Sequence, residues 1–316
     1  MPLSLFEGPE KKVELAVVEG HPPLRALGED RWREVVRAAG ADVVSLMRGE
    51  HIDAYLLSES SLFVYDEFVT MITCGRTNLV SAVDAMLEEI DPADVSVFVY
   101  ERKKEHFPRE QPTSFFDDAR LLREWLPGRA ICFGAEHEHS VRLFHSTRPH
   151  LPEPDDRTLE VLMHGIDPAG AARFERLEPD DRVARDLGLS RCFEGYAVDE
   201  HVFAPTGYSF NAISGWAYTT LHVTPQRLGS YVSFETNAPE LADDLEGLLA
   251  ELLEVFAPES FDVVLFEPSA RVFDLGVPGY RPRTHVREEV CGYHVTFQHW
   301  FRPCDEPGRA IELQLG

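Results

Sequence analysis

Glu59, Ser60 and Ser61 form a polar run in AYLLSESSLFVYDEFVTMITCG, between two apolar stretches that are typical of strands. A serine hydroxyl can attack the carbonyl carbon of the preceding residue where the backbone is strained. The peptide bond then becomes an ester, and loss of the serine α-proton expels the upstream carboxylate, leaving dehydroalanine that hydrolyses to an N-terminal pyruvoyl group. Without further signals, the commoner interpretation of such a serine is an exposed turn.

Self-cleavage of this kind needs a base for the α-proton and donors for the oxyanion, from residues distant in the sequence. The segment GYSFNAISGWAYTTLHVTP offers Ser209 in a turn led by glycine and His222 at the end of the next strand. Cys74 precedes a predicted helix, whose N-terminus would lower the thiol pKa and make the thiol a proton carrier. Taken alone, His222 is predicted to be a half-buried strand histidine and Cys74 a small core residue.

Other polar residues have ordinary structural interpretations. Glu7 and Glu10 in FEGPEKK are expected to be solvated charges near the N-terminus. Asp155 and Asp156, with Glu160, are expected to form a helix N-cap and an acidic first turn.

Three histidines in EHEHSVRLFH, His137, His139 and His145, would share one face of a strand. No further ligand pattern accompanies them, so the sequence predicts no metal site.

Composition limits the classes of function. The 316 residues include 30 Lys and Arg against 55 Asp and Glu, a formal charge of −25, which argues against binding nucleic acid or anionic lipid and suits a cationic small ligand. The five scattered cysteines contain no CxxC pair, and no window approaches the roughly 18 apolar residues of a membrane span. We therefore expect a cytoplasmic protein with no membrane segment.

The elements that must position these residues are those of an α+β chain. Short apolar runs rich in Val, Phe and Tyr recur along the chain, and amphipathic helices are predicted over 29–40, 77–90, 115–126 and 238–256. Many strands follow one another with connections too short for a crossover helix, which favours antiparallel sheets with outer helices. A Pro-rich stretch over 148–158 is predicted to connect two similar halves.

Seven separated motifs, in order FEGPEKKVE, YLLSESSLFV, TCG, LEVLM, GYSFN, HVTP and SYVSFETN, resemble the S-adenosylmethionine decarboxylases of the eukaryotic type. These are pyruvoyl enzymes of polyamine synthesis. The resemblance covers nearly the whole chain, residues 1–316, as a single domain. It implies a four-layer αββα sandwich, with two antiparallel sheets face to face and helices outside.

The resemblance also assigns roles. It implies cleavage between Glu59 and Ser60 into a β chain, 1–59, and an α chain, 60–316, that begins with a pyruvoyl cofactor made from Ser60. The cofactor would form a Schiff base with the amino group of S-adenosylmethionine. The remaining implied roles are processing helpers (Ser209 and His222, the latter taking the α-proton), proton donor (Cys74), active-site acids (Glu7 and Glu10) and adenine-stacking rings (Phe6 and Phe203).

Two positions depart from the family pattern. Gln226 stands where a glutamate accepts hydrogen bonds from the ribose, so ribose binding is expected to be looser or the substrate to differ. The residues that match a buried acidic cluster, which binds putrescine in some members, are Glu14, Asp156, Glu160 and Glu235. The lysine expected beside that cluster is Ile72 here, which leaves activation by putrescine open.

Gln226, with Glu59, is grouped with the substrate-binding residues, and it is the one feature that keeps another substrate, ornithine or arginine, in view. A non-catalytic regulatory relative is the third hypothesis, although Ser60, Ser209, His222 and Cys74 are all present. Both a monomer and a homodimer of αβ units fit a sandwich with exposed sheet edges.

Overall fold

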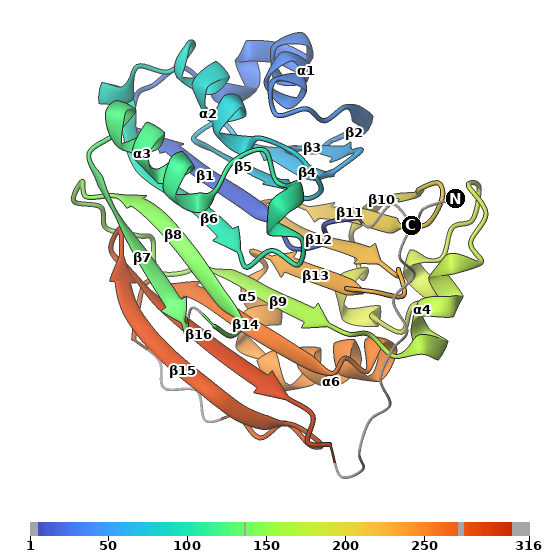
Figure 1. Ribbon diagram of the computed structural model, residues 1–316. Helices are drawn as coiled ribbons and strands as arrows, with labels where there is room; N and C mark the ends of the chain where they lie inside the picture. The colour runs from blue at the N-terminus through green and yellow to red at the C-terminus, as the bar shows by residue number, and fades with distance from the viewer. Residues whose placement is uncertain (1–5, 136, 271–274, 305–316) are drawn as a thin grey trace.

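The computed structural model describes residues 6–135, 137–270 and 275–304. In Figure 1, two twisted antiparallel sheets face one another, with α1 to α3 outside the first and α4 to α6 outside the second. This arrangement confirms the predicted α+β sandwich of four layers.

The first sheet has the strand order β2-β3-β4-β5-β1-β6-β8-β7. Its strands are β1 (Lys11–Val17), β2 (Val43–Arg48), β3 (Asp53–Leu57), β4 (Ser60–Val64), β5 (Phe68–Thr73), β6 (Val95–Lys103), β7 (Gly128–Gly134) and β8 (Ser140–Ser146). Its helices are α1 (Gly28–Ala38), α2 (Leu79–Leu87) and α3 (Phe115–Trp125), with 3-10 turns at Leu24–Leu27, Pro92–Asp94 and Pro108–Glu110.

The second sheet repeats this topology, because its order β10-β11-β12-β13-β9-β14-β16-β15 is the first order with eight added to each number. Its strands are β9 (Thr158–His164), β10 (Ala197–Val202), β11 (Tyr208–Ser214), β12 (Ala217–Thr224), β13 (Tyr231–Thr236), β14 (Ser260–Glu267), β15 (Arg281–Val290) and β16 (Tyr293–Phe301). Its helices are α4 (Pro168–Glu175), α5 (Pro239–Asp243) and α6 (Leu245–Phe256), with 3-10 turns at Ala184–Asp186 and Ser190–Cys192. The shared order supports the predicted division into two similar halves.

Apolar side chains fill three layers between these elements. One core lies between the first sheet and its helices, one between the second sheet and its helices, and smaller clusters lie between the sheets. Because central strands are covered on both faces, every residue of β4 and of β9 is buried. Polar residues on these strands therefore point into places that water hardly reaches.

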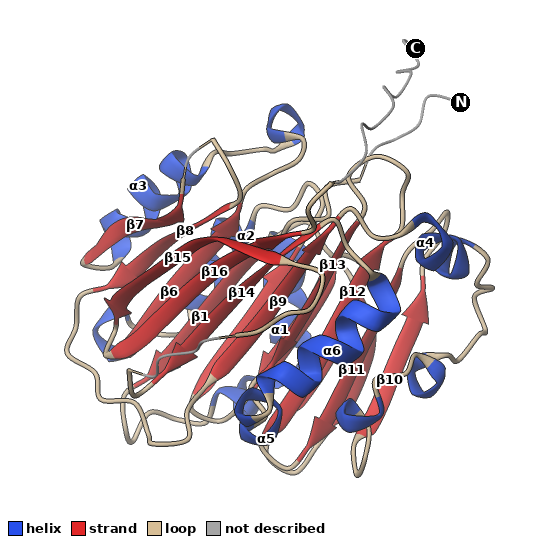
Figure 2. Cartoon of the chain, turned by 90° about the horizontal axis from the view of Figure 1, so that it is seen from below, coloured by secondary structure: helices blue, strands red, loops and turns tan. Residues whose placement is uncertain are grey.

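Two predicted elements differ from the structure. The helix predicted over 238–256 is divided into α5 and α6 at Asp244, whose φ of −109° and ψ of 54° are not helical and whose side chain caps α6 through the Gly247 N–H. Figure 2 shows α6 crossing the outer face of the second sheet.

The helix start predicted at Asp155 and Asp156 is wrong, since Glu160 lies in β9. Hydrogen bonding to β13 and β14 on either side, together with burial of both faces, favours the strand over the local capping signal. Among the described residues, no helix has the length and apolarity needed to cross a membrane.

Candidate active site

Ser60 is the first residue of β4 and pairs with Leu57 on β3 and Thr73 on β5. Its side chain is only 2% exposed, so the exposed-turn interpretation is wrong. Its φ of 127° lies in a region that residues with a Cβ rarely adopt, a conformation that costs of order 1–3 kcal/mol. The backbone strain that self-cleavage requires is therefore present at this serine.

The carbonyl oxygen of Glu59, at the bond that would break, accepts two hydrogen bonds from one residue. The backbone N–H of Cys74 donates at 2.9 Å and the Cys74 thiol at 3.3 Å. Two donors aimed at one carbonyl oxygen favour the negative charge that develops there when a nucleophile attacks.

Cys74 does not lie at a helix N-terminus, because α2 begins only at Leu79. The expected lowering of its thiol pKa is wrong as well. Burial, reinforced by the nearby carboxylates of Glu59 and Glu10, raises the pKa of Cys74 above its ordinary value. The thiol thus keeps its proton at neutral pH, as a proton donor must.

Ser209 and His222 are cross-strand partners on β11 and β12, and the Ser209 Oγ lies 2.7 Å from the His222 Nδ1. The other ring nitrogen, Nε2, lies 3.3 Å from the hydroxyl oxygen of Ser61, the residue after the strained serine. Burial lowers the pKa of His222 to about 3, so the ring is neutral at pH 7 and can accept a proton.

Three polar residues of this network were not predicted. Ser61 donates to the Asn211 Oδ1 at 2.7 Å, Thr220 donates to the same oxygen at 2.8 Å, and the Asn211 amide donates to the Tyr55 carbonyl at 3.2 Å. Asn211 and Thr220 stand two residues from Ser209 and His222 on their strands, and residues at that spacing share a face. This alternation is the sequence signal that could have found them.

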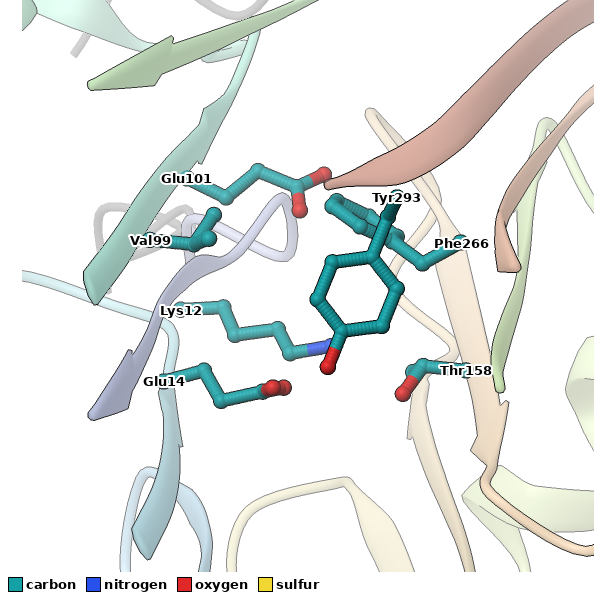
Figure 3. A pocket seen from close by; sticks show the side chains of 7 residues that line it. All are labelled: Lys12, Glu14, Val99, Glu101, Thr158, Phe266 and Tyr293. Atoms are coloured by element: carbon teal, nitrogen blue, oxygen red, sulfur yellow. The ribbon is translucent and has the colours of Figure 1, made fainter. Parts of the chain in front are cut away.

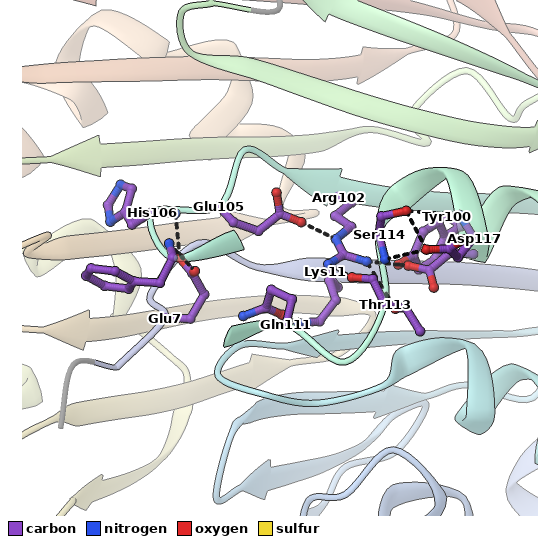
Figure 4. Close-up of polar contacts among 12 residues, drawn as sticks. Glu7, Lys11, Tyr100, Arg102, Glu105, His106, Gln111, Thr113, Ser114 and Asp117 are labelled. Atoms are coloured by element: carbon purple, nitrogen blue, oxygen red, sulfur yellow. Dashed lines mark hydrogen bonds and ion pairs between the residues drawn. The ribbon is translucent and has the colours of Figure 1, made fainter. Parts of the chain in front are cut away.

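Glu10 and Glu7 are buried rather than solvated. Glu10 Oε1 accepts a hydrogen bond from Ser233 at 2.6 Å and lies 3.4 Å from the Ser60 hydroxyl, and burial raises the pKa of Glu10 to about 8. The Glu7 carboxylate accepts the backbone N–H groups of His106 and Phe107 at 2.8 and 2.7 Å (Figure 4), and burial raises its pKa too. Glu10 thus contacts the serine directly, whereas Glu7 is turned toward the loop after β6.

Lys11 is a second feature that sequence reasoning missed. Its ammonium group donates to the Gly75 carbonyl at 3.2 Å and to the Gln111 Oε1 at 2.7 Å (Figure 4), and burial, followed by the charge of Arg102, lowers the pKa of Lys11 to about 8. It lies close enough to Glu59 to oppose the burial that raises the pKa of that carboxyl to about 7. Glu59 and Lys11 therefore both have pKa values that burial moves toward the neutral form.

Gln226 is held by the backbone of Phe6. The Phe6 N–H donates to the Gln226 Oε1 at 2.8 Å, and the Gln226 Nε2 donates to the Phe6 carbonyl at 2.6 Å. A carboxylate could not make the second bond, because it has no proton to donate. Phe6 lies against Gly75, and Phe203 is half-buried at the end of β10.

The predicted acidic cluster lies between the sheets. Glu160 and Glu235 are directly opposed on β9 and β13, and the ammonium group of Lys12 lies 3.0 Å from a carboxylate oxygen of each. Figure 3 shows Lys12 and Glu14 of β1 facing Tyr293, whose hydroxyl donates to Asp156. Lys103 and Glu101 of β6 join the cluster through Glu160, and the cavity left among these side chains measures about 10 Å³.

Lys12 accounts for the departure at Ile72. The two residues are directly paired across β1 and β5, and Ile72 packs into an apolar cluster between the sheets. The positive charge is therefore supplied by the strand next to the one on which it was expected.

The chain and its fold match those of known proteins. The adenosylmethionine decarboxylase family matches residues 3–300. A crystal structure of the Trypanosoma brucei AdoMetDC-delta26 monomer superposes with a TM-score of 0.60 and 25% identity, covering 77% of this chain and 99% of that one.

Curated relatives belong to the same family. The S-adenosylmethionine decarboxylase proenzyme of Trypanosoma brucei brucei is 34% identical over 97% of this chain and 89% of its own length. The corresponding proenzyme of Dictyostelium discoideum is 31% identical over 87% of this chain and 80% of its own length. The chain therefore belongs to the adenosylmethionine decarboxylase family, as its sequence motifs predicted.

Proposed function

We propose that this protein cleaves its own chain between Glu59 and Ser60 and then decarboxylates S-adenosylmethionine, yielding an aminopropyl donor for spermidine and spermine synthesis. Family membership and the proenzyme relatives support the carboxy-lyase activity and a pyruvoyl cofactor. The single observation that carries the cleavage position is the strained, buried Ser60 next to a carbonyl that accepts two hydrogen bonds from Cys74.

The residues present fit the formation of that cofactor. Ser60 Oγ attacks the Glu59 carbonyl carbon, the C–N bond breaks, and the nitrogen takes the hydroxyl proton, which gives an ester. Cys74 stabilises the oxyanion through its N–H and thiol. Neutral His222, oriented by Ser209, removes the Ser60 α-proton, and the ester C–O bond breaks to release the carboxylate of Glu59. This elimination separates residues 1–59 from residues 60–316, and water then replaces the nitrogen at the new terminus, which leaves as ammonia.

In the decarboxylation, the pyruvoyl group supplies an electron-withdrawing carbonyl when carbon dioxide leaves. The chain's own residues supply the protons. The Cys74 thiol holds the proton that the product carbon receives, because burial keeps this thiol protonated. The Glu10 carboxyl, in contact with the Ser60 hydroxyl, holds a second proton where the substrate amino group would arrive, with Glu7 in the same segment.

Substrate recognition would use Phe6 and Phe203 as faces for the adenine and the sulfonium charge. The bidentate contact of Gln226 with Phe6 supports a positioning role, since it fixes the backbone that carries one of the two rings. Gln226 then holds the Phe6 backbone in place instead of accepting hydrogen bonds from the ribose, and adenosine remains the group that the protein recognises.

The acidic cluster supports activity without putrescine. Lys12 and Lys103 place two ammonium groups among its carboxylates, and the remaining cavity of about 10 Å³ has room for about one water molecule, far less than a diamine. A cytoplasmic location is supported by Cys74, Cys132, Cys192 and Cys291, which are free thiols.

Mass spectrometry and carbon dioxide release from the purified protein test this proposal. We expect two fragments that divide after Glu59, a ketone-reactive terminus on the larger one, and carbon dioxide from S-adenosylmethionine but none from ornithine or arginine. Ser60→Ala should remain one inactive chain, and Cys74→Ala should still cleave but lose most turnover. An intact chain with an unmodified Ser60 in active preparations would refute the mechanism, and release from ornithine alone would refute the substrate.

A further inference from the structure

A cluster of histidines lies between the two halves of the molecule, apart from the residues used above. His139, in the turn between β7 and β8 of the first half, stacks on His299 of β16 with 4.6 Å between the ring centroids. The ring centroid of His164, at the end of β9, lies 4.1 Å from that of His139. Asp262 of β14 lies among them, with Oδ2 3.2 Å from the His164 Nε2 and 3.9 Å from the His139 Nδ1.

The spacing of these groups is close to that of a metal site. One ligand atom from each of His139, His164 and Asp262 lies within 4.8 Å of the others. In a tetrahedral zinc site with bonds near 2.1 Å, ligand atoms are about 3.4 Å apart. Adjustment of the side chains by on the order of 1 Å would close the set, and His139 lies in a turn with a third of its side chain exposed.

His164 is itself incompletely satisfied. It is 8% exposed, and its Nδ1 has no hydrogen-bond partner among the described residues. A buried polar atom without a partner is uncommon and costs free energy, so it points to a bound group. The ring centroid of His106 lies 5.7 Å from that of His164.

The surroundings give a cation both access and support. A cavity of about 470 Å³, lined in part by His106, His139 and His299, lies against the cluster. His299 Nδ1 lies 2.6 Å from the second oxygen of Asp262, the kind of contact that orients a metal-binding carboxylate. Two imidazoles and a carboxylate are borderline ligands that favour Zn²⁺ over Mg²⁺ or Ca²⁺.

We propose that His139, His164 and Asp262 bind a divalent transition-metal ion of the zinc type, with His299 orienting Asp262. Such an ion joins the turn before β8 in the first half to β9 and β14 in the second. It is a structural link between the halves, and it does not depend on the reaction proposed above.

Calorimetric titration of the chelator-treated full chain with Zn²⁺ tests the site. We expect one Zn²⁺ per chain, a dissociation constant of about 1 µM or lower, and a rise in Tm of a few degrees at saturation, with Mg²⁺ producing neither effect. His139→Gln should weaken binding at least tenfold. The matched control is His137→Gln, which removes an exposed histidine two residues away and should bind as the wild type does.

A second measurement guards against misfolded variants and other zinc ligands. Co²⁺ bound to the wild type should show the visible absorption of a nitrogen and oxygen site, and this signal should disappear in His139→Gln and in Asp262→Asn. Far-UV circular dichroism checks that each variant folds. If Asp262→Asn does not fold, the loss of the cobalt signal in His139→Gln is sufficient to test the site. No Zn²⁺ binding by the wild type, wild-type affinity in His139→Gln, or a cobalt–thiolate charge-transfer band from an exposed cysteine such as Cys132 would each overturn the proposal.

Discussion

Glu10 shows how a single residue depends on its surroundings. It accepts a hydrogen bond from Ser233, lies against the Ser60 hydroxyl, and has the charges of Lys103 and Glu235 nearby. Burial is the largest influence and raises the pKa of Glu10 to about 8, so this carboxyl is mostly protonated at pH 7. A neutral acid beside the serine can donate a hydrogen bond where a carboxylate could not.

The raised pKa predicts a pH-dependent effect of Glu10→Gln. The folded state keeps a proton up to about pH 8 that the unfolded state loses near its ordinary value of 4.5, so Glu10 makes the protein less stable as pH rises through that window. The amide does not titrate. In an uncleaved Ser60→Ala background, Tm measured from pH 5 to 9 should show Glu10→Gln gaining steadily on its parent up to about pH 8 and then levelling off.

Glu19→Gln is the control for this experiment, because it removes a carboxylate from an exposed position. Its Tm difference from the parent should not follow the same curve. A pH-independent difference for Glu10→Gln would contradict the assignment of a raised pKa to Glu10.

At the residue scale, the sequence predicted which side chains belong to the site better than it predicted their burial and pKa values. The motif resemblance selected Ser60, Ser209 and His222, and the structure brings the last two into contact beside Ser61. The pKa of Cys74 was predicted in the wrong direction, because its burial depends on chain segments far from it in sequence. The spacing of Asn211 from Ser209 places both on one face of β11, but its partners Ser61 and Tyr55 come from the other sheet and could not be predicted.

Among the elements, the turn after β5 connects the β3–β4 hairpin to the N-terminal segment. Gly75 has a φ of +64°, and its N–H donates to the Glu7 carbonyl. A Cβ at this position would lie 2.4 Å from the Glu59 Oε2 and 3.1 Å from the Phe6 ring. The turn thus requires glycine for two reasons, its conformation and the close approach of Glu59.

Gly75→Ala is predicted to slow self-cleavage, because the new methyl group displaces Glu59 at the proposed scissile bond. Gly40→Ala is the matched control, since Gly40 has a φ of +86° and open space where a Cβ would lie. Both changes should cost about 1 kcal/mol through the backbone conformation. A time course of fragment formation on denaturing gels should show slow cleavage for Gly75→Ala alone, and equal rates for the two variants would refute the steric argument.

Helices and strands could be predicted wherever apolar residues recur at a regular spacing over a long segment. The helix of residues 115–126 and the strands around Ser60 and His222 follow their patterns. Two effects of tertiary structure could not be predicted from the sequence. Asp244 ends one helix and caps the next. β9 is a strand because β13 and β14 pair with it on either side, and its one acidic residue, Glu160, meets Lys12 and Lys103 of the facing sheet.

At the scale of the whole molecule, the site exists only because two halves of the same topology face each other. Ser60 of β4 and Cys74, which directly follows β5, come from the first half, and Ser209 and His222 come from the second sheet. The same holds for the acidic cluster, in which Lys12 of β1 reaches carboxylates across the interface. Because this ion pair joins the two sheets, removing the charge of Lys12 should lower the free energy of unfolding of the whole protein.

Lys12→Met tests this connection. The variant leaves Glu160 opposite Glu235 without their shared cation, with Glu14 close by, and breaking a buried pair in this way costs roughly 3–5 kcal/mol. Urea unfolding at pH 7 should show that loss, and lowering the pH to 5 should recover part of it as carboxyls become protonated. Arg157→Met removes a cation whose partner Asp243 is largely exposed and should cost much less.

A double variant separates lost charge from lost packing. If uncompensated carboxylates cause the instability, Glu235→Gln should be destabilising in the wild type yet should restore stability to Lys12→Met, a coupling of about 1–3 kcal/mol. Excess putrescine should likewise stabilise Lys12→Met, because a diamine can supply the missing positive charge, and should leave the wild type unchanged. Additive effects of the two substitutions would mean that Lys12 stabilises the protein through its methylene chain rather than its charge. Activation of the wild type by putrescine would show that Lys12 and Lys103 do not replace the diamine in the acidic cluster.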